Sequence, residues 1–435
     1  MVWQDFWLAN PVDGENPYYP DMFEKNARDY VRRIRNHPSI GIYVGRNEGN
    51  PPERIDNYLR KMTQEEHPGL YYIPHSSSGS VSGGGPYRAM APKEYFRSYG
   101  HDKMHSERGM PTVMTYEDMV RAFGEEHMEP VNTRQHPNNI YGMHDYTLES
   151  AQGGDSFNQI IATAFGEPKD AKEFAELAQF VNYNGYRAIF EGRSEHRRGM
   201  ILWMSHPSWP SMVWQTYDYY FEPTAAYFGV KKASAPIRIQ WNPVSKNVEV
   251  VNNNALDQNG LTAYAAILTY DGKVVFETSA ALDSKEDTTT PVFPLTFDQP
   301  ELTDTYYIKL KLTRGDDLLA DNFYWEGKED GNYTQLMSLG QAKVSVKAKY
   351  AKTADGYKVT ATLRNTSKIP ALMVRLKMQG SKTGESILPV FYEDNYFALL
   401  GGESKTVEIT FKDEDCHGEV PELIVKGFNV KEMVK

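Results

Sequence analysis

Apolar and polar residues change their spacing near residue 235 of the chain. Before that point, helix-like and strand-like stretches alternate with segments rich in Gly, Pro and Ser. After it, short β-branched runs alternate with turns. This pattern predicts an α/β architecture for residues 1–234 and an all-β architecture for 235–435. The second part divides near residue 340, which predicts two sandwiches of about 100 residues each, 235–340 and 341–435.

In the α/β part, proline and turn residues mark the ends of the predicted helices and strands. Apolar residues at helical spacing stop before Pro38, and a short apolar run bounded by turn residues follows. The segment 76–85, rich in Ser and Gly, is too long for a simple connection and predicts a functional loop or a mobile linker. The predicted elements are helices over Asp21–Asn36, Glu53–Met62, Tyr116–Phe123 and Ala171–Ile189, and strands over Ile40–Gly45, Leu70–Ile73, around Met104 and Gly199–Met204.

Composition narrows the class of protein. The 435 residues are 40% hydrophobic and 24% charged, which is the balance of a soluble globular chain, and the length predicts two to four domains. No apolar run reaches the ~20 residues that span a bilayer, and the N-terminus lacks a signal-peptide pattern. A net charge of -11 without a basic cluster argues against a nucleic-acid partner. The single cysteine, Cys416, excludes an intrachain disulfide framework.

Two glutamates follow short apolar strands in the predicted α/β part: Glu48 and Glu107. A retaining glycosidase needs a carboxylic acid and a carboxylate nucleophile about 5 to 5.5 Å apart, and the ends of two parallel strands can supply them. Asn47, directly before Glu48, is placed to hydrogen-bond a sugar hydroxyl. The competing interpretation is that both glutamates are ordinary solvated surface groups.

Aromatic residues form a second candidate set: Trp3, Tyr87, Trp203, Trp209 and Trp214. Sugars present apolar C–H faces that stack on aromatic rings, while their hydroxyls need polar partners. These residues therefore fit a saccharide pocket, and core packing is the competing interpretation.

Motifs for other chemistry are weak. His101 and His105 stand four apart, as two metal ligands on a helix would, but the sequence nominates no third ligand, so we predict no metal site. Phosphate-binding, dinucleotide-binding and nucleophile-elbow patterns are missing from the sequence.

Several segments, in order, resemble glycoside hydrolase family 2, and within it the β-mannosidase, exo-β-D-glucosaminidase and endo-β-mannosidase branches. The segments are Val2-Trp3-Gln4-Asp5-Phe6, Asn36-His37-Pro38-Ser39-Ile40, Gly45-Arg46-Asn47-Glu48-Gly49-Asn50-Pro51-Pro52, Gly85-Pro86-Tyr87, Ser106-Glu107-Arg108-Gly109-Met110-Pro111, Trp203-Met204, Ser208-Trp209-Pro210, Trp214-Gln215-Thr216-Tyr217-Asp218-Tyr219-Tyr220 and Pro389 to Phe397.

The resemblance implies a partial (β/α)8 TIM barrel over 1–234, followed by two immunoglobulin-like β-sandwich domains. It implies that Glu48 is the acid/base, that Glu107 is the nucleophile of a double displacement, and that Asn47 binds the sugar at its 2-position. It also implies that Trp3 and Trp203 stack on the sugar. The expected partner is an oligosaccharide or glycoside substrate, with no metal or cofactor.

The chain departs from the family pattern at its start. Family members carry N-terminal domains and two further barrel strands, whereas this sequence begins at what resembles the third strand, so a missing N-terminal portion is an expected partner. Two rival hypotheses follow: a non-catalytic carbohydrate-binding remnant or inactive fragment, and a scaffold that binds no sugar. The sequence leaves the compartment open, and the resemblance makes the periplasm or the cell exterior the expectation for an intact bacterial enzyme.

Overall fold

The computed structural model describes residues 1–85, 87–98, 103–149, 153–193 and 199–435. The chain forms two compact units. The first comprises Met1–Pro86, His101–Arg108 and His196–Trp203, and the second comprises Tyr87–Gly100, Gly109–Glu195 and Met204–Lys435. Within the described ranges, no helix is long and apolar enough to cross a membrane.

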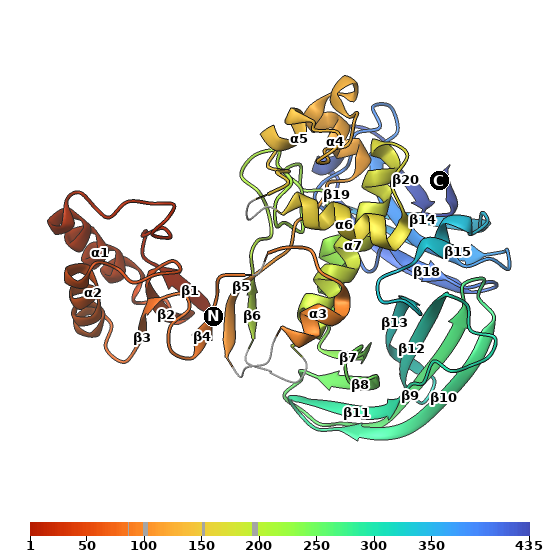
Figure 1. The fold of residues 1–435 in the computed structure, drawn as a ribbon, viewed down its shortest axis with the longest axis horizontal. Helices are drawn as coiled ribbons and strands as arrows, with labels where there is room; N and C mark the ends of the chain where they lie inside the picture. Colours follow the sequence, from red (N-terminus) through yellow and green to blue (C-terminus); the bar gives the residue numbers. More distant parts are fainter. Residues whose placement is uncertain (86, 99–102, 150–152, 194–198) are drawn as a thin grey trace. The chain divides into compact units, whose positions relative to one another are not determined.

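The first unit contains two parallel sheets, with strand orders β1-β2-β3 and β4-β5-β6 (Figure 1). Its elements are β1 Val2–Asp5, α1 Pro20–Ile34, β2 Ile40–Arg46, α2 Glu53–Glu66, β3 Tyr71–His75, β4 Val81–Ser82, β5 Met104–Arg108 and β6 Met200–Leu202. The predicted helices and strands of this unit are confirmed, with small shifts at their ends. The expectation of a loop or linker over 76–85 misses β4, a strand too short to leave a periodic pattern.

Strand β2 is buried on both faces, which explains its apolar sequence. On one face Tyr43 belongs to a cluster with Phe23 of α1 and Leu59 of α2. On the other face Val44 packs with Ile73 of β3. Because parallel strands end at the same edge of a sheet, the residues that follow β1, β2 and β3 come together there.

The helical part of the second unit is organised around α7. Its elements are α3 Pro92–Arg97, α4 Tyr116–Phe123, η1 Glu125–His127, α5 Asn139–Met143, α6 Gly154–Phe165, α7 Ala171–Glu191 and α8 Ala225–Ala233. Asp170 caps α7, since its Oδ1 accepts a hydrogen bond from the Glu173 amide at 2.8 Å. A Cβ at Gly229 of α8 would lie 2.4 Å from the Tyr183 carbonyl oxygen, so only glycine permits this close packing of α8 on α7. The predicted α4 and α7 are confirmed.

From residue 237 onward the chain forms antiparallel sheets, as its β-branched pattern predicts. The first pair of sheets has orders β11-β8-β7 and β10-β9-β12-β13, and the second has β14-β15-β19-β17 and β18-β16-β20-β21. A core that includes Val248, Ile267 and Leu310 joins the first pair. The strands are β7 Ile237–Trp241, β8 Asn247–Asn252, β9 Gln258–Thr269, β10 Val274–Ser284, β11 Thr288–Pro294, β12 Thr305–Arg314, β13 Asp317–Gly327, β14 Val344–Lys352, β15 Gly356–Asn365, β16 Ala371–Gly380, β17 Val390–Tyr392, β18 Phe397–Leu399, β19 Ser404–Lys412, β20 Pro421–Gly427 and β21 Val430–Val434; short η2 Thr334–Ser338 and η3 Glu414–Cys416 complete the unit.

A buried polar network joins the end of α7 to β13. Arg187 Nη1 donates to Asn322 Oδ1 at 3.0 Å, and its guanidinium lies 3.9 Å from the centre of the Tyr324 ring. Glu191 Oε1 accepts hydrogen bonds from the Tyr324 hydroxyl at 2.8 Å and from Asn322 Nδ2 at 3.0 Å. Because all four side chains are buried, each would leave unsatisfied partners if removed.

Glu326, near this network on β13, makes the stability of the protein depend on pH. Burial raises the pKa of its carboxyl to about 7 from 4.5; Arg187 opposes the rise, and Asp330 and Glu191 add to it. The folded chain therefore holds a proton that the unfolded chain loses first, so the free energy of unfolding falls as the pH rises from about 4.5 to about 7.

We expect Glu326→Gln to remove this pH dependence. Between pH 5 and pH 8, the effect of the substitution on the free energy of unfolding is expected to shift by about 2.5 kcal/mol towards stabilisation. Thermal unfolding at both pH values measures the difference. Glu286→Gln, at an exposed position, is the matched control. An equal effect of Glu326→Gln at both pH values would contradict the expectation.

Candidate active site

Glu48 follows β2 by two residues, at the carboxyl edge of the first sheet, and is partly buried. Its backbone has φ of 48°, a left-handed conformation that is unusual for glutamate and is found at functional sites when the surroundings hold it in place. Here the Glu48 amide donates to Ser76 Oγ at 2.9 Å, and Asn10 Nδ2 donates to Glu48 Oε2 at 2.6 Å. Two neighbouring segments therefore hold the Glu48 backbone and carboxylate.

Arg46 anchors the segment that carries Asn10. Its side chain is only 3% exposed, and Nε donates to the Ala9 carbonyl at 2.7 Å. Nη1 donates to Asn16 Oδ1 at 2.8 Å, while the Asn47 amide donates to the Leu8 carbonyl at 3.1 Å. The chain after β1 is thus tied to the end of β2, which positions Asn10 at the Glu48 carboxylate.

Glu107 lies within β5, whereas the sequence placed it just after a strand. The strand extends through Arg108 because Arg108 pairs with Leu202 of β6. Ser106 and Arg108 are buried while Glu107 is partly exposed, and successive side chains of a strand point to opposite faces. The Glu107 side chain therefore points away from the face that buries its two neighbours.

The Ser/Gly segment contacts the parts of the chain that carry both glutamates. A Cβ at Gly84, which has φ of 80°, would lie 3.2 Å from Glu48 Oε1. A Cβ at Gly83 would lie 2.4 Å from Ser106 Oγ, next to Glu107 in the sequence. Only glycine allows these approaches. Residues 83 and 84 therefore link the surroundings of the two glutamates within the first unit.

Ser76 and Asn10 are the polar residues at this edge that sequence reasoning missed. Ser76 is 3% exposed, and its Oγ donates to Asn47 Oδ1 at 3.1 Å while it accepts from the Glu48 amide. It thereby orients the predicted sugar-binding Asn47. A signal was present, since Ser76 directly follows β3 and polar residues after parallel strands gather at one edge.

The predicted aromatic residues separate between the two units. Trp3 on β1 is partly buried against the cluster of Val44 and Ile73. Its Nε1 donates to Asp5 Oδ2 at 3.1 Å; burial raises the pKa of the Asp5 carboxyl, and this hydrogen bond opposes the rise. Trp203 directly follows β6 and is 40% exposed.

Trp203 lies beside the strand of Glu107, because its amide donates to the Arg108 carbonyl at 2.9 Å. Tyr87 belongs to the second unit, where its ring centre lies 5.0 Å from that of Trp214. Trp209, also in the second unit, is 43% exposed and stacks on His144 with 5.9 Å between ring centres. The structure thus gathers Trp3, Trp203, Asn47 and both glutamates in the first unit and assigns Tyr87 to the second.

The described ranges contain no group of three or more His, Cys, Asp or Glu side chains placed to hold a metal ion. Of the histidines considered from the sequence, His101 lies outside the described residues. His105 lies on β5, where its Nδ1 is 2.9 Å from Ser82 Oγ.

Comparisons with curated proteins return glycosidases. The chain is 24% identical over 550 residues to a mannosylglycoprotein endo-β-mannosidase from Lilium longiflorum, covering 99% of this chain and 57% of that protein. It is 29% identical over 452 residues to an exo-β-D-glucosaminidase from Streptomyces avermitilis, covering 92% of this chain and 48% of the relative. The chain thus spans about half the length of these relatives.

Solved structures and a family model agree with these matches. An Amycolatopsis orientalis exo-chitosanase in complex with PNP-β-D-glucosamine superposes with a TM-score of 0.89 at 22% identity, covering 100% of this chain and 57% of the other. A β-D-mannosidase from Dictyoglomus thermophilum gives 0.78 at 20% identity, covering 99% and 53%. The model of the exo-β-D-glucosaminidase Ig-fold domain matches residues 322–430.

These findings define the chain as a homologue of glycosyl hydrolases. Its relatives include β-mannosidases and exo-β-D-glucosaminidases, which confirms the resemblance to this branch of glycoside hydrolase family 2 that was seen in the sequence.

Proposed function

We propose that this protein is a retaining β-glycosidase that cleaves β-mannosides or β-glucosaminides by double displacement. The observation that carries the proposal is the contact of residues 83 and 84 with both glutamate-bearing segments at the carboxyl edge of parallel strands. Under this proposal residues 1–234 belong to a (β/α)8 barrel, and 235–340 and 341–435 are immunoglobulin-like domains.

In the proposed reaction Glu107 attacks the anomeric carbon while Glu48 donates its proton to the departing oxygen. The bond from the anomeric carbon to the leaving group breaks, and a covalent glycosyl–Glu107 ester forms. Glu48, now a carboxylate, then takes a proton from water, whose oxygen displaces Glu107. The product keeps its anomeric configuration because two inversions occur.

The neighbouring residues have supporting roles in this proposal. Asn47, oriented by Ser76, hydrogen-bonds the sugar next to the reacting carbon. Trp203, exposed beside β5, offers a ring face to the sugar. Trp3 contributes the apolar wall beneath the site, and Asn10 orients the Glu48 carboxylate. Tyr87 is proposed as a further substrate contact.

A mechanism-based label tests this function. We expect dinitrophenyl 2-deoxy-2-fluoro-β-mannoside or β-glucoside to add one fluorosugar to the wild-type chain, measured by intact-mass spectrometry. The fluorine slows hydrolysis of the intermediate, so the ester accumulates. Glu107→Gln should show no adduct, and Glu53→Gln, an exposed glutamate at the start of α2, should be labelled like wild type. A wild-type chain that neither sugar labels would contradict the proposal and favour a carbohydrate-binding role without catalysis.

A further inference from the structure

The turn from Asp218 to Glu222 in the second unit presents aromatic rings to solvent. Phe221 is 59% exposed and Tyr219 is 38% exposed. Isolated exposed apolar residues are ordinary, but two large rings on one short turn form a patch. The Tyr217–Pro223 bridge closes the turn at its base, so both rings stand on a defined scaffold.

Hydrogen bonds to Asp218 hold this turn in a strained conformation. Phe221 has φ of 67°, which is unfavourable for a bulky residue. The buried Asp218 compensates: its Oδ1 accepts from the Tyr220 amide at 2.9 Å and from the Glu222 amide at 3.0 Å, and its carbonyl accepts from the Phe221 amide at 3.1 Å. Because the exposed Phe221 ring gains little from burial, packing alone does not account for its presence there.

His206 covers one face of the Phe221 ring. The two ring centres lie 4.3 Å apart with 13° between the planes, and His206 Nε2 donates to the Tyr219 carbonyl at 3.3 Å. The Tyr219 ring is nearly parallel to His206, at 20° and 6.5 Å. Since His206 occupies one face of Phe221, the exposed area belongs to the opposite face and the edge. We name these three residues the aromatic platform.

We propose that the aromatic platform binds a pyranose ring of a β-glycan chain and so holds polymeric substrate independently of bond cleavage. The open face of Phe221 suits the apolar C–H face of a sugar, and the 38% exposed Tyr219 adds a second aromatic ring on the same turn. The class of ligand rests on the proposed function, because mannosides and glucosaminides share this C–H face. Because hydrogen bonds already order this turn in the free protein, binding of a sugar loses less conformational entropy.

Affinity for soluble oligosaccharides tests the platform. The Glu107→Gln substitution removes turnover. In this background, isothermal titration calorimetry gives the Kd of the protein for mannohexaose and for chitohexaose (the glucosamine hexamer). Phe221→Asn removes the ring while keeping a residue that tolerates positive φ, and we expect it to raise Kd about 10-fold. Phe221→Trp should restore binding. Phe391→Ala removes a 67% exposed phenylalanine on β17 and is the matched control.

Hydrolysis of p-nitrophenyl monosaccharides, measured without the Glu107 substitution, should be the same in Phe221→Asn and wild type. Unchanged Kd values in Phe221→Asn, an equal loss in Phe391→Ala, or the failure of both oligosaccharides to bind the chain with an intact platform would overturn the inference. If the oligosaccharides bind but the wild-type chain forms no fluorosugar adduct, the catalytic proposal is refuted and the inference about the aromatic platform is retained.

Discussion

Replacing Glu48 by alanine is expected to lower kcat for p-nitrophenyl β-glycosides about 10²- to 10⁴-fold, because the departing oxygen loses its proton donor and water loses its base. Azide should restore much of the rate, since it is a good nucleophile that needs no general base and fits the space left by the carboxylate. A dinitrophenyl leaving group should be less sensitive to the substitution, because it departs without protonation.

The configuration of the azide product distinguishes the two glutamates. In Glu48→Ala, azide displaces Glu107 from the covalent intermediate, and the product is the β-glycosyl azide. In Glu107→Ala, azide attacks the substrate directly from the opposite face, and the product is the α-glycosyl azide. Proton NMR of the products decides between them. An α-azide from Glu48→Ala, or no rescue of either variant, would contradict the assigned roles.

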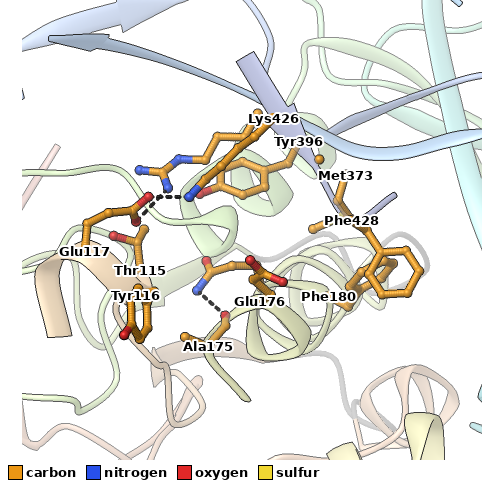
Figure 2. Close-up of a pocket in the computed structure, with 13 residues that line it drawn as sticks. Thr115, Tyr116, Glu117, Ala175, Glu176, Phe180, Met373, Tyr396, Lys426 and Phe428 are labelled. Atoms are coloured by element: carbon orange, nitrogen blue, oxygen red, sulfur yellow. Dashed lines mark hydrogen bonds and ion pairs between the residues drawn. The ribbon is translucent and has the colours of Figure 1, made fainter. Parts of the chain in front are cut away.

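Replacing Arg375 by alanine is expected to lower the free energy of unfolding by about 3 to 5 kcal/mol, because it leaves the buried Glu222 carboxylate without its counter-ion. Arg375 lies on β16 and is 5% exposed. Its Nη2 is 2.8 Å from Glu222 Oε1, and its Nη1 is 3.2 Å from Glu117 Oε2. Figure 2 shows the Lys426 amine in direct contact with the Glu117 carboxylate. Both side chains line a small cavity of about 50 Å³. That volume holds a few water molecules and is too small for a sugar ring.

Urea unfolding followed by tryptophan fluorescence measures this loss. Arg364→Ala, at an exposed position of β15, is the control and should change little. The double variant Arg375→Met with Glu222→Gln should recover part of the stability, since both charges leave together. Equal stability of Arg375→Ala and Arg364→Ala would contradict the expectation.

Acid should weaken the ion pairs of Glu117 with Arg375 and Lys426. Burial alone would raise the pKa of the Glu117 carboxyl, but Arg375 and Lys426 hold it well below its ordinary value of 4.5. The stabilisation is therefore complete above about pH 4.5 and is lost as the pH falls below that value.

The sequence predicted local structure where periodicity was strong. The helix expected over Asp21–Asn36 is α1, Pro20–Ile34, because its apolar stripe and the following Pro38 define both face and end. The sequence also nominated Glu48, since a carboxylate after a buried parallel strand falls at the edge of the sheet where ligands bind. The positions that it missed depend on contacts distant in sequence. The hydrogen bond from Asn10 to Glu48 joins residues 38 apart, and no spacing rule encodes it.

The sequence also could not predict the left-handed backbone of Phe221, because this conformation arises from hydrogen bonds to Asp218 and not from the propensity of phenylalanine. The sequence nominated Tyr87 as part of an aromatic set, but it could not predict that Tyr87 belongs to the second unit, with its ring beside that of Trp214. Sequence order gives no measure of which compact unit a connecting residue joins.

The buried network between α7 and β13 constrains how this protein can be divided or recombined. Ending a recombinant fragment at residue 234 would remove Asn322 and Tyr324, and with them the hydrogen bonds that they make to Arg187 and Glu191 on α7. The most obvious boundary in the sequence is therefore a poor site for cutting. Chimaeras with related glycosidases should exchange α7 together with the sheet that contains β13.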